Sequence, residues 1–186
     1  VRLVEPDVAV LINAGDAHLE GFGSRQGIAD AKGEIIGGLA ECGTAVLNRD
    51  SPFFAQWSRL AGLRRILSFG LQESADVRAT DVQCHLDRCE FTLHLQGRGR
   101  TVHLPMAGVH NVMNSLAAAA AAAALSTDPE TIVAGLAEAR SLGGRLRQRR
   151  SACGALIIDD TYNASPLSRI GKINAIFQRS NFYLLP

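Results

Sequence analysis

The sequence is poor in aromatic residues and in lysine, and it carries almost no net charge. Aromatic side chains make up 5% of the 186 residues, and the formal net charge is +1 at pH 7. This balance gives no field that would attract nucleic acid or an anionic membrane surface. The longest apolar run, 116–125, is mostly alanine and shorter than the roughly 20 residues that span a bilayer. We therefore expect neither nucleic acid nor a membrane as a partner.

Cysteine is also scarce, and its spacing excludes a dense disulfide framework. The cysteines are Cys42, Cys84, Cys89 and Cys153, which form no C-x-x-C pair. This pattern favours reduced thiols in the cytoplasm. A zinc site at Cys84, His85 and Cys89 would have only three ligands at an unusual spacing, so strand residues are the favoured interpretation. The first seven residues lack the apolar stretch of a signal peptide, and the absence of an initiator methionine indicates a fragment. We expect a cytoplasmic monomer.

The apolar residues, 47% of the chain, are arranged as in a packed α/β domain. Buried strands are predicted at 8–12, 45–47, 66–69 and 155–158, with helical patterns between several of them, which indicates a mostly parallel sheet flanked by helices. Alternating polar and apolar residues over 77–104 predict a small antiparallel meander inserted in the main fold, with a turn at 96–99. Helices are predicted at 114–125 and at 129–139, the second with Asp128 as N-cap.

Lys32 is one of only two lysines, the other being Lys172, among 19 basic residues. Ser24 is a suitable N-cap for a helix reaching about Leu39, and Lys32 then falls in an apolar stripe with Ile28, Ile35, Ile36 and Leu39. Burial there would favour a neutral amine, which can act as a Schiff-base nucleophile or a general base, or can take up carbon dioxide as a carbamate. Composition and periodicity alone favour the simpler alternative, in which the lysine stem packs in the stripe and its charge reaches water.

Further residues place Lys32 in a longer pattern. His18 follows the first buried strand, where open α/β sheets bind ligands. Four segments then occur in order: 18–24 with 31–35, the G-x-H-N-x-x-N element at 108–114, Gly-Arg-Leu at 144–146, and the acidic segment 159–166. Together they resemble the central, ATP-binding domain of the Mur ligases, a P-loop NTPase-like fold.

The resemblance implies a role for each matching residue. His18 and Lys32 are 14 positions apart, as are the histidine and the carbamylated lysine of the family, which implies a catalytic pair that holds magnesium. Asn111 and Asn114 take the places of two asparagines near the adenine of ATP. Arg145 and Asp160 match an arginine and a carboxylate that bind the nucleotide.

The family is implied to form an amide bond through an acyl phosphate made with ATP. The segment Asp-Asp-Thr-Tyr-Asn-Ala at 159–164 resembles the member type that adds D-alanyl-D-alanine to a UDP-N-acetylmuramoyl tripeptide in peptidoglycan synthesis. We expect residues 1–166 to form the central domain, incomplete at its N-terminal side, and 167–186 to be an atypical or truncated tail.

Two alternatives remain beside this interpretation. The 186 residues contain no G-x-x-x-x-G-K-[ST] phosphate loop, so the chain alone is expected to bind ATP weakly and to be inactive. It could then be a non-catalytic or degenerate nucleotide-binding module of the same fold. A Schiff-base lyase that uses Lys32 is a further alternative, but it leaves the asparagine, arginine and aspartate motifs unexplained.

Overall fold

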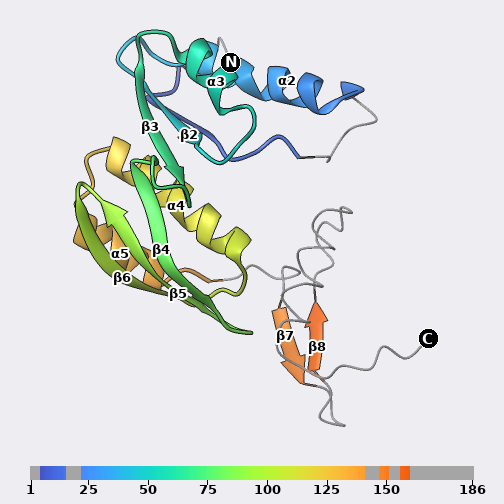
Figure 1. Ribbon diagram of the computed structural model, residues 1–186, viewed down its shortest axis with the longest axis vertical. Helices are drawn as coiled ribbons and strands as arrows, with labels where there is room; N and C mark the ends of the chain where they lie inside the picture. The colour runs from blue at the N-terminus through green and yellow to red at the C-terminus, as the bar shows by residue number, and fades with distance from the viewer. Residues whose placement is uncertain (1–4, 16–21, 141–146, 151–155, 160–186) are drawn as a thin grey trace.

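A computed structural model describes residues 5–15, 22–140, 147–150 and 156–159. Its main feature is a six-stranded sheet in which the strands lie in sequence order (Figure 1). The strands are β1 (Val8–Leu11), β2 (Thr44–Asn48), β3 (Arg65–Gly70), β4 (Val77–Cys84), β5 (Cys89–Leu95) and β6 (Arg98–Leu104). The first four run parallel, and β5 and β6 continue antiparallel. The predicted mostly parallel α/β fold is confirmed in this part of the chain.

The meander predicted over 77–104 is present, but it is not a separate insertion. β4 pairs with the end of β3 through only two residue pairs, Phe69 with Val77 and Gly70 with Arg78. Because the two strands overlap only there, a short loop joins them without a crossover helix. Asp76 holds this junction by accepting hydrogen bonds from the backbone N–H and the hydroxyl of Ser68, at 2.8 and 2.6 Å. The parallel strands and the meander therefore form one continuous sheet.

The turn between β5 and β6 is shorter than predicted. It consists of Gln96 and Gly97, with φ of 54° and 74°, and Arg98 already belongs to β6. Two successive residues with positive φ are typical of the two-residue turns that suit the twist of a hairpin.

Helices cover both faces of the sheet, and each face has its own apolar core (Figure 1). On one face α2 (Arg25–Gly37) and α3 (Phe54–Ala61) pack on β1 and β2. On the other face α4 (Val109–Ala124) crosses β1 to β5, and α5 (Pro129–Ala137) packs on α4 and β6. The alanine-rich sequence of α4 lets its backbone come close to the strands. The result is a three-layer arrangement with the sheet in the middle.

The predicted helix after Ser24 is confirmed. Ile28, Ile36 and Leu39 of the predicted stripe are buried, whereas Lys32 is exposed. The Ser24 hydroxyl accepts a hydrogen bond from the N–H of Gly27 at 3.0 Å and caps α2. The buried residues of the helix are Ile28, Ala29, Gly33 and Ile36. A Cβ added to Gly33 would lie 2.8 Å from Leu60 of α3, so the small residues mark the contact between the two helices.

The two later helices begin differently. α5 starts as predicted, with Asp128 accepting from the N–H of Thr131 at 2.9 Å. α4 begins at Val109, five residues before the predicted start, and Gly108 precedes it without a side-chain cap. Gly108 has φ +91° and ψ 143°, a region essentially restricted to glycine. The sequence therefore lacks the usual polar N-cap signal at this helix start.

The prediction for 155–158 is correct in element type and wrong in context. β8 (Leu156–Asp159) pairs antiparallel with β7 (Arg147–Arg150) in a separate two-stranded sheet, and not with the parallel strands. Within the described residues, every helix is too short or too polar to cross a membrane.

Candidate functional site

An open hollow of about 420 Å³ lies where β1 ends. β1 is the edge strand of the described sheet, so side chains from both faces meet beside it. Lys32 and Ile35 reach the hollow from α2, Asn114 reaches it from α4, and residues 10–13 form its floor. The structure thus brings together two predicted site residues, Lys32 and Asn114, that are far apart in the sequence. The carboxyl end of a parallel strand is the usual ligand position in open α/β sheets.

Lys32 is exposed, which contradicts the premise that burial in the apolar stripe makes its amine neutral. Its Nζ donates a hydrogen bond to the carbonyl oxygen of Asn13 at 2.8 Å. Lys32, Ile35 and the acceptor Asn13 all line the hollow. The simpler alternative considered from the sequence, a packed stem with an accessible amine, describes this side chain better.

The start of α4 presents the two predicted asparagines in different ways. The Asn111 side-chain amide donates to the carbonyl oxygen of Ala107 at 2.8 Å and so ties the first turn of the helix to the segment before it. Asn114, one turn later, is exposed and lines the hollow. Asn111 is therefore held by the fold, whereas the Asn114 amide is accessible to a ligand.

Three other predicted site residues, His18, Arg145 and Asp160, lie outside the described residues. The predicted pairing of His18 with Lys32 and the roles of Arg145 and Asp160 stay predictions. The same holds for the boundary at residue 166 and the tail 167–186.

Sequence reasoning missed the polar residues that fix the strand ends. Asn48, buried at the end of β2, donates from its amide to the carbonyl oxygen of Ile12 at 2.8 Å and accepts from the N–H of Asp50 at 2.8 Å. Asp50 accepts in turn from the N–H groups of Leu71 and Gln72. These bonds join the loops after β1, β2 and β3. The signal was a polar Asn-Arg-Asp segment directly after a buried strand.

The zinc site considered at Cys84, His85 and Cys89 has no support. No cluster of three or more metal-ligating side chains occurs among the residues that the structure describes. Cys84 ends β4 and Cys89 begins β5, as the strand interpretation predicts.

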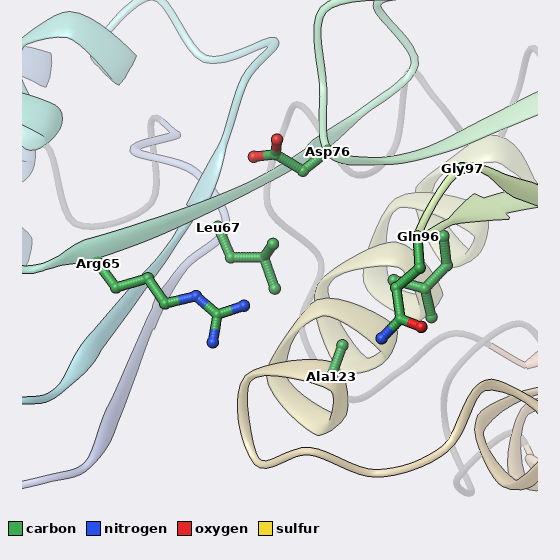
Figure 2. A pocket seen from close by; sticks show the side chains of 7 residues that line it. Arg65, Leu67, Asp76, Gln96, Gly97 and Ala123 are labelled. Carbon is green, nitrogen blue, oxygen red and sulfur yellow. The ribbon is translucent and has the colours of Figure 1, made fainter.

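A second hollow, of about 270 Å³, lies away from the predicted residues. Figure 2 shows Arg65 at the start of β3 and Gln96 of the β5–β6 turn reaching toward each other, with Ala123 of α4 below them and Asp76 at the rim. None of the site residues predicted from the sequence lines it. The hollow beside Lys32 and Asn114 is therefore the candidate functional site.

The three-layer fold is that of an α/β domain, and the chain belongs to the Mur ligase family. Residues 1–122 match the family's Mur ligase middle domain. Among curated relatives, the UDP-N-acetylmuramoyl-tripeptide--D-alanyl-D-alanine ligase of Escherichia coli (strain K12) is 36% identical over 186 residues. The enzyme of the same name from Bacillus subtilis (strain 168) is 38% identical over 167 residues.

Solved structures agree with this assignment. MurF from Acinetobacter baumannii superposes with a TM-score of 0.91 at 39% identity, covering 96% of this chain and 39% of that one. MurF ligase from Thermotoga maritima in complex with ADP superposes with a TM-score of 0.82 at 32% identity, covering 95% of this chain and 40% of that one.

The chain spans only part of each relative. It covers 41% of the Escherichia coli enzyme with 100% of its own length, and 35% of the Bacillus subtilis enzyme with 90%.

Proposed function

We propose that this chain is the nucleotide-binding middle part of a ligase that joins D-alanyl-D-alanine to a UDP-N-acetylmuramoyl tripeptide in peptidoglycan synthesis. The observation that carries the proposal is the shared hollow of Lys32 and Asn114 at the end of β1. Family membership over residues 1–122 and the named activity of the relatives support the reaction type.

The nucleotide is assigned to the α4 side of the hollow. Asn114 offers an accessible amide that can exchange hydrogen bonds with the edge of adenine. Asn111 keeps the first turn of α4 in place and thereby positions Asn114. Arg145 and Asp160 complete the proposed nucleotide contacts. The solved complex of the Thermotoga maritima relative with ADP supports a nucleotide as a ligand of the whole protein.

Magnesium is assigned to the α2 side, on Lys32 as a carbamate and on His18. The described donors there are suitable in kind: the Asn13 carbonyl oxygen lies within hydrogen-bond distance of Lys32, and the Asn114 side chain shares the hollow. Oxygen donors of this type are those that magnesium prefers, and a carbamate would add an anionic one. When bound, the ion would neutralise crowded phosphate and carboxylate oxygens.

The proposed reaction has two steps. The terminal carboxylate of the UDP-sugar peptide attacks the γ-phosphorus of ATP, which gives an acyl phosphate and ADP. The amine of D-alanyl-D-alanine then attacks the acyl carbon, and phosphate leaves with the formation of the amide bond. We place the whole protein in the cytoplasm as a monomer.

The test is ADP release by the whole protein that contains this chain, measured with Mg-ATP and each acceptor omitted in turn. We expect release to require both the UDP-N-acetylmuramoyl tripeptide and D-alanyl-D-alanine. Lys32→Arg, which keeps the charge but cannot form a carbamate, should lower kcat by at least about 100-fold, as expected for loss of a group that stabilises developing charge.

Lys172→Arg is the matched control, because it makes the same exchange at the other lysine of these 186 residues, and it should leave kcat unchanged. Equal rates for Lys32→Arg and the unchanged protein would refute the assigned role of Lys32. ADP release without either acceptor would instead favour a nucleotide-binding or hydrolytic module. For the 186-residue chain alone, calorimetric titration should show binding of Mg-ATP weaker than micromolar.

A further inference from the structure

Cys84 and Cys89 face each other across the hairpin that joins β4 and β5. Cys84 is the last residue of β4, Cys89 is the first of β5, and the two are paired directly in the strand register. Residues 85–88 form the loop between them. Directly opposed residues in an antiparallel pair place their side chains on the same face of the sheet.

The hydrogen bonds of the hairpin identify the type of pair. The N–H of His85 donates to the carbonyl oxygen of Arg88 at 2.7 Å, so these two form the hydrogen-bonded pair next to the loop. Because the pair types alternate, Cys84 and Cys89 occupy a non-hydrogen-bonded pair, where Cα atoms are about 4.5 Å apart. Disulfides span Cα separations of roughly 4.4–6.8 Å. The backbone geometry therefore admits a bond between the two sulfurs without rearrangement of the strands.

The two thiols differ in access. Cys89 is fully buried against α4, whereas Cys84 is partly exposed, and both are free thiols. Burial, followed by the contact with Cys84, raises the pKa of Cys89 to about 12. Because Cys84 is partly exposed and Cys89 is buried, an oxidant from solution reaches Cys84 first.

We propose that Cys84 and Cys89 are a redox-modification site that a hydroperoxide converts reversibly into an intramolecular disulfide. In the first step the Cys84 sulfur attacks the peroxide oxygen, the O–O bond breaks, and Cys84 becomes a sulfenic acid while the peroxide is reduced to an alcohol or to water. In the second step the Cys89 sulfur attacks the Cys84 sulfur. The S–S bond forms, the S–OH bond breaks, and water leaves with the Cys89 proton. A dithiol reductant reverses the reaction by exchange.

The experiment uses the 186-residue chain with Cys42→Ser and Cys153→Ser, so that only the pair remains and neither of its members is changed. Treatment with hydrogen peroxide should lower the intact mass by about 2 Da, the two hydrogens lost on disulfide formation. Peptide mapping should show Cys84 joined to Cys89, and dithiothreitol should restore both thiols. Cys84→Ala in the same background should abolish the mass loss.

Peroxide that leaves both thiols open to alkylation, or that gives only dimers on non-reducing gels, overturns the proposal. The result does not depend on ligase activity, so it is separable from failure of the proposed function.

Discussion

The Nζ of Lys32 donates a hydrogen bond to the carbonyl oxygen of Asn13 across 2.8 Å, and so connects helix α2 to the chain just beyond β1. The bond explains how an exposed lysine in an otherwise apolar stripe is directed to one place. Lys32 and Asn13 both line the hollow, which Asn114 of α4 lines from the other face of the sheet.

Replacing Lys32 should therefore affect chemistry more than folding. Lys32→Arg keeps a donor for Asn13, and the residue is exposed, so the free energy of unfolding should change by less than about 0.5 kcal/mol. Carbon-13-labelled bicarbonate should give a carbamate signal in the unchanged protein and none in the variant. The comparison is made by urea unfolding and carbon-13 NMR, with Lys172→Arg as control. A carbamate signal that persists in Lys32→Arg would place the modification elsewhere.

Substitutions of the two α4 asparagines, Asn111 and Asn114, should differ in their effect on the stability of the fold. Asn114→Ala removes an exposed amide in the hollow, so we expect weaker nucleotide binding by the whole protein with little change in stability. Asn111→Ala removes the hydrogen bond to Ala107, so it should also lower the free energy of unfolding by about 1 kcal/mol. Titration with ADP and thermal melting measure the two effects. Equal loss of stability in both variants would contradict the distinction.

The sequence was sufficient for features that depend on local chemistry. The Ser24 and Asp128 caps and the strands predicted at 8–12, 45–47 and 66–69 follow from side-chain type and period, and they are confirmed. The antiparallel strands predicted over 77–104 are also present, although they continue the main sheet. The start of α4 was missed because Gly108 uses a backbone conformation in place of a polar cap. Glycine adopts many backbone conformations, so the sequence does not reveal that Gly108 has a φ of +91°.

The premise that Lys32 is buried was wrong for a different reason, because tertiary packing decides which residues of α2 are buried. The stripe was assigned from the large apolar residues Ile28, Ile35 and Ile36, but small residues decide how closely two helices approach. Gly33 admits the side chains of α3, which turns the buried face of α2 toward that helix. Lys32 and Asn114 line the same hollow because α2 and α4, on opposite faces of the sheet, both lie beside the edge strand β1. The periodicity of a single helix does not predict such an arrangement of two helices.

Trp57 of α3 should report on the contact between α2 and α3. It is the only tryptophan, it is fully buried, and its Nε1 donates to the carbonyl oxygen of Ala29 at 3.0 Å. Trp57→Phe should destabilise the fold by about 1–3 kcal/mol, because it leaves that carbonyl without its donor and opens space in the core. Urea unfolding followed by circular dichroism measures the change. A loss no larger than that of an exposed control such as Leu63→Ala would contradict the packing described.

Cys89 should make stability fall at alkaline pH. Burial first, and the hydrogen bond with Cys84 second, raise the pKa of Cys89 from its ordinary value of 9.0 to about 12 in the folded chain. The unfolded thiol ionises first as pH rises. The stabilisation is therefore complete below pH 9, and it is lost progressively as pH rises from there through 12. The free energy of unfolding of the unchanged chain should decline over this window relative to that of Cys89→Ala, whereas Cys42→Ala, at an exposed cysteine, should follow the unchanged chain. Curves for the unchanged chain and Cys89→Ala that stay parallel from pH 8 to 11 would contradict this prediction, because they would show that Cys89 ionises equally easily in the folded and unfolded states.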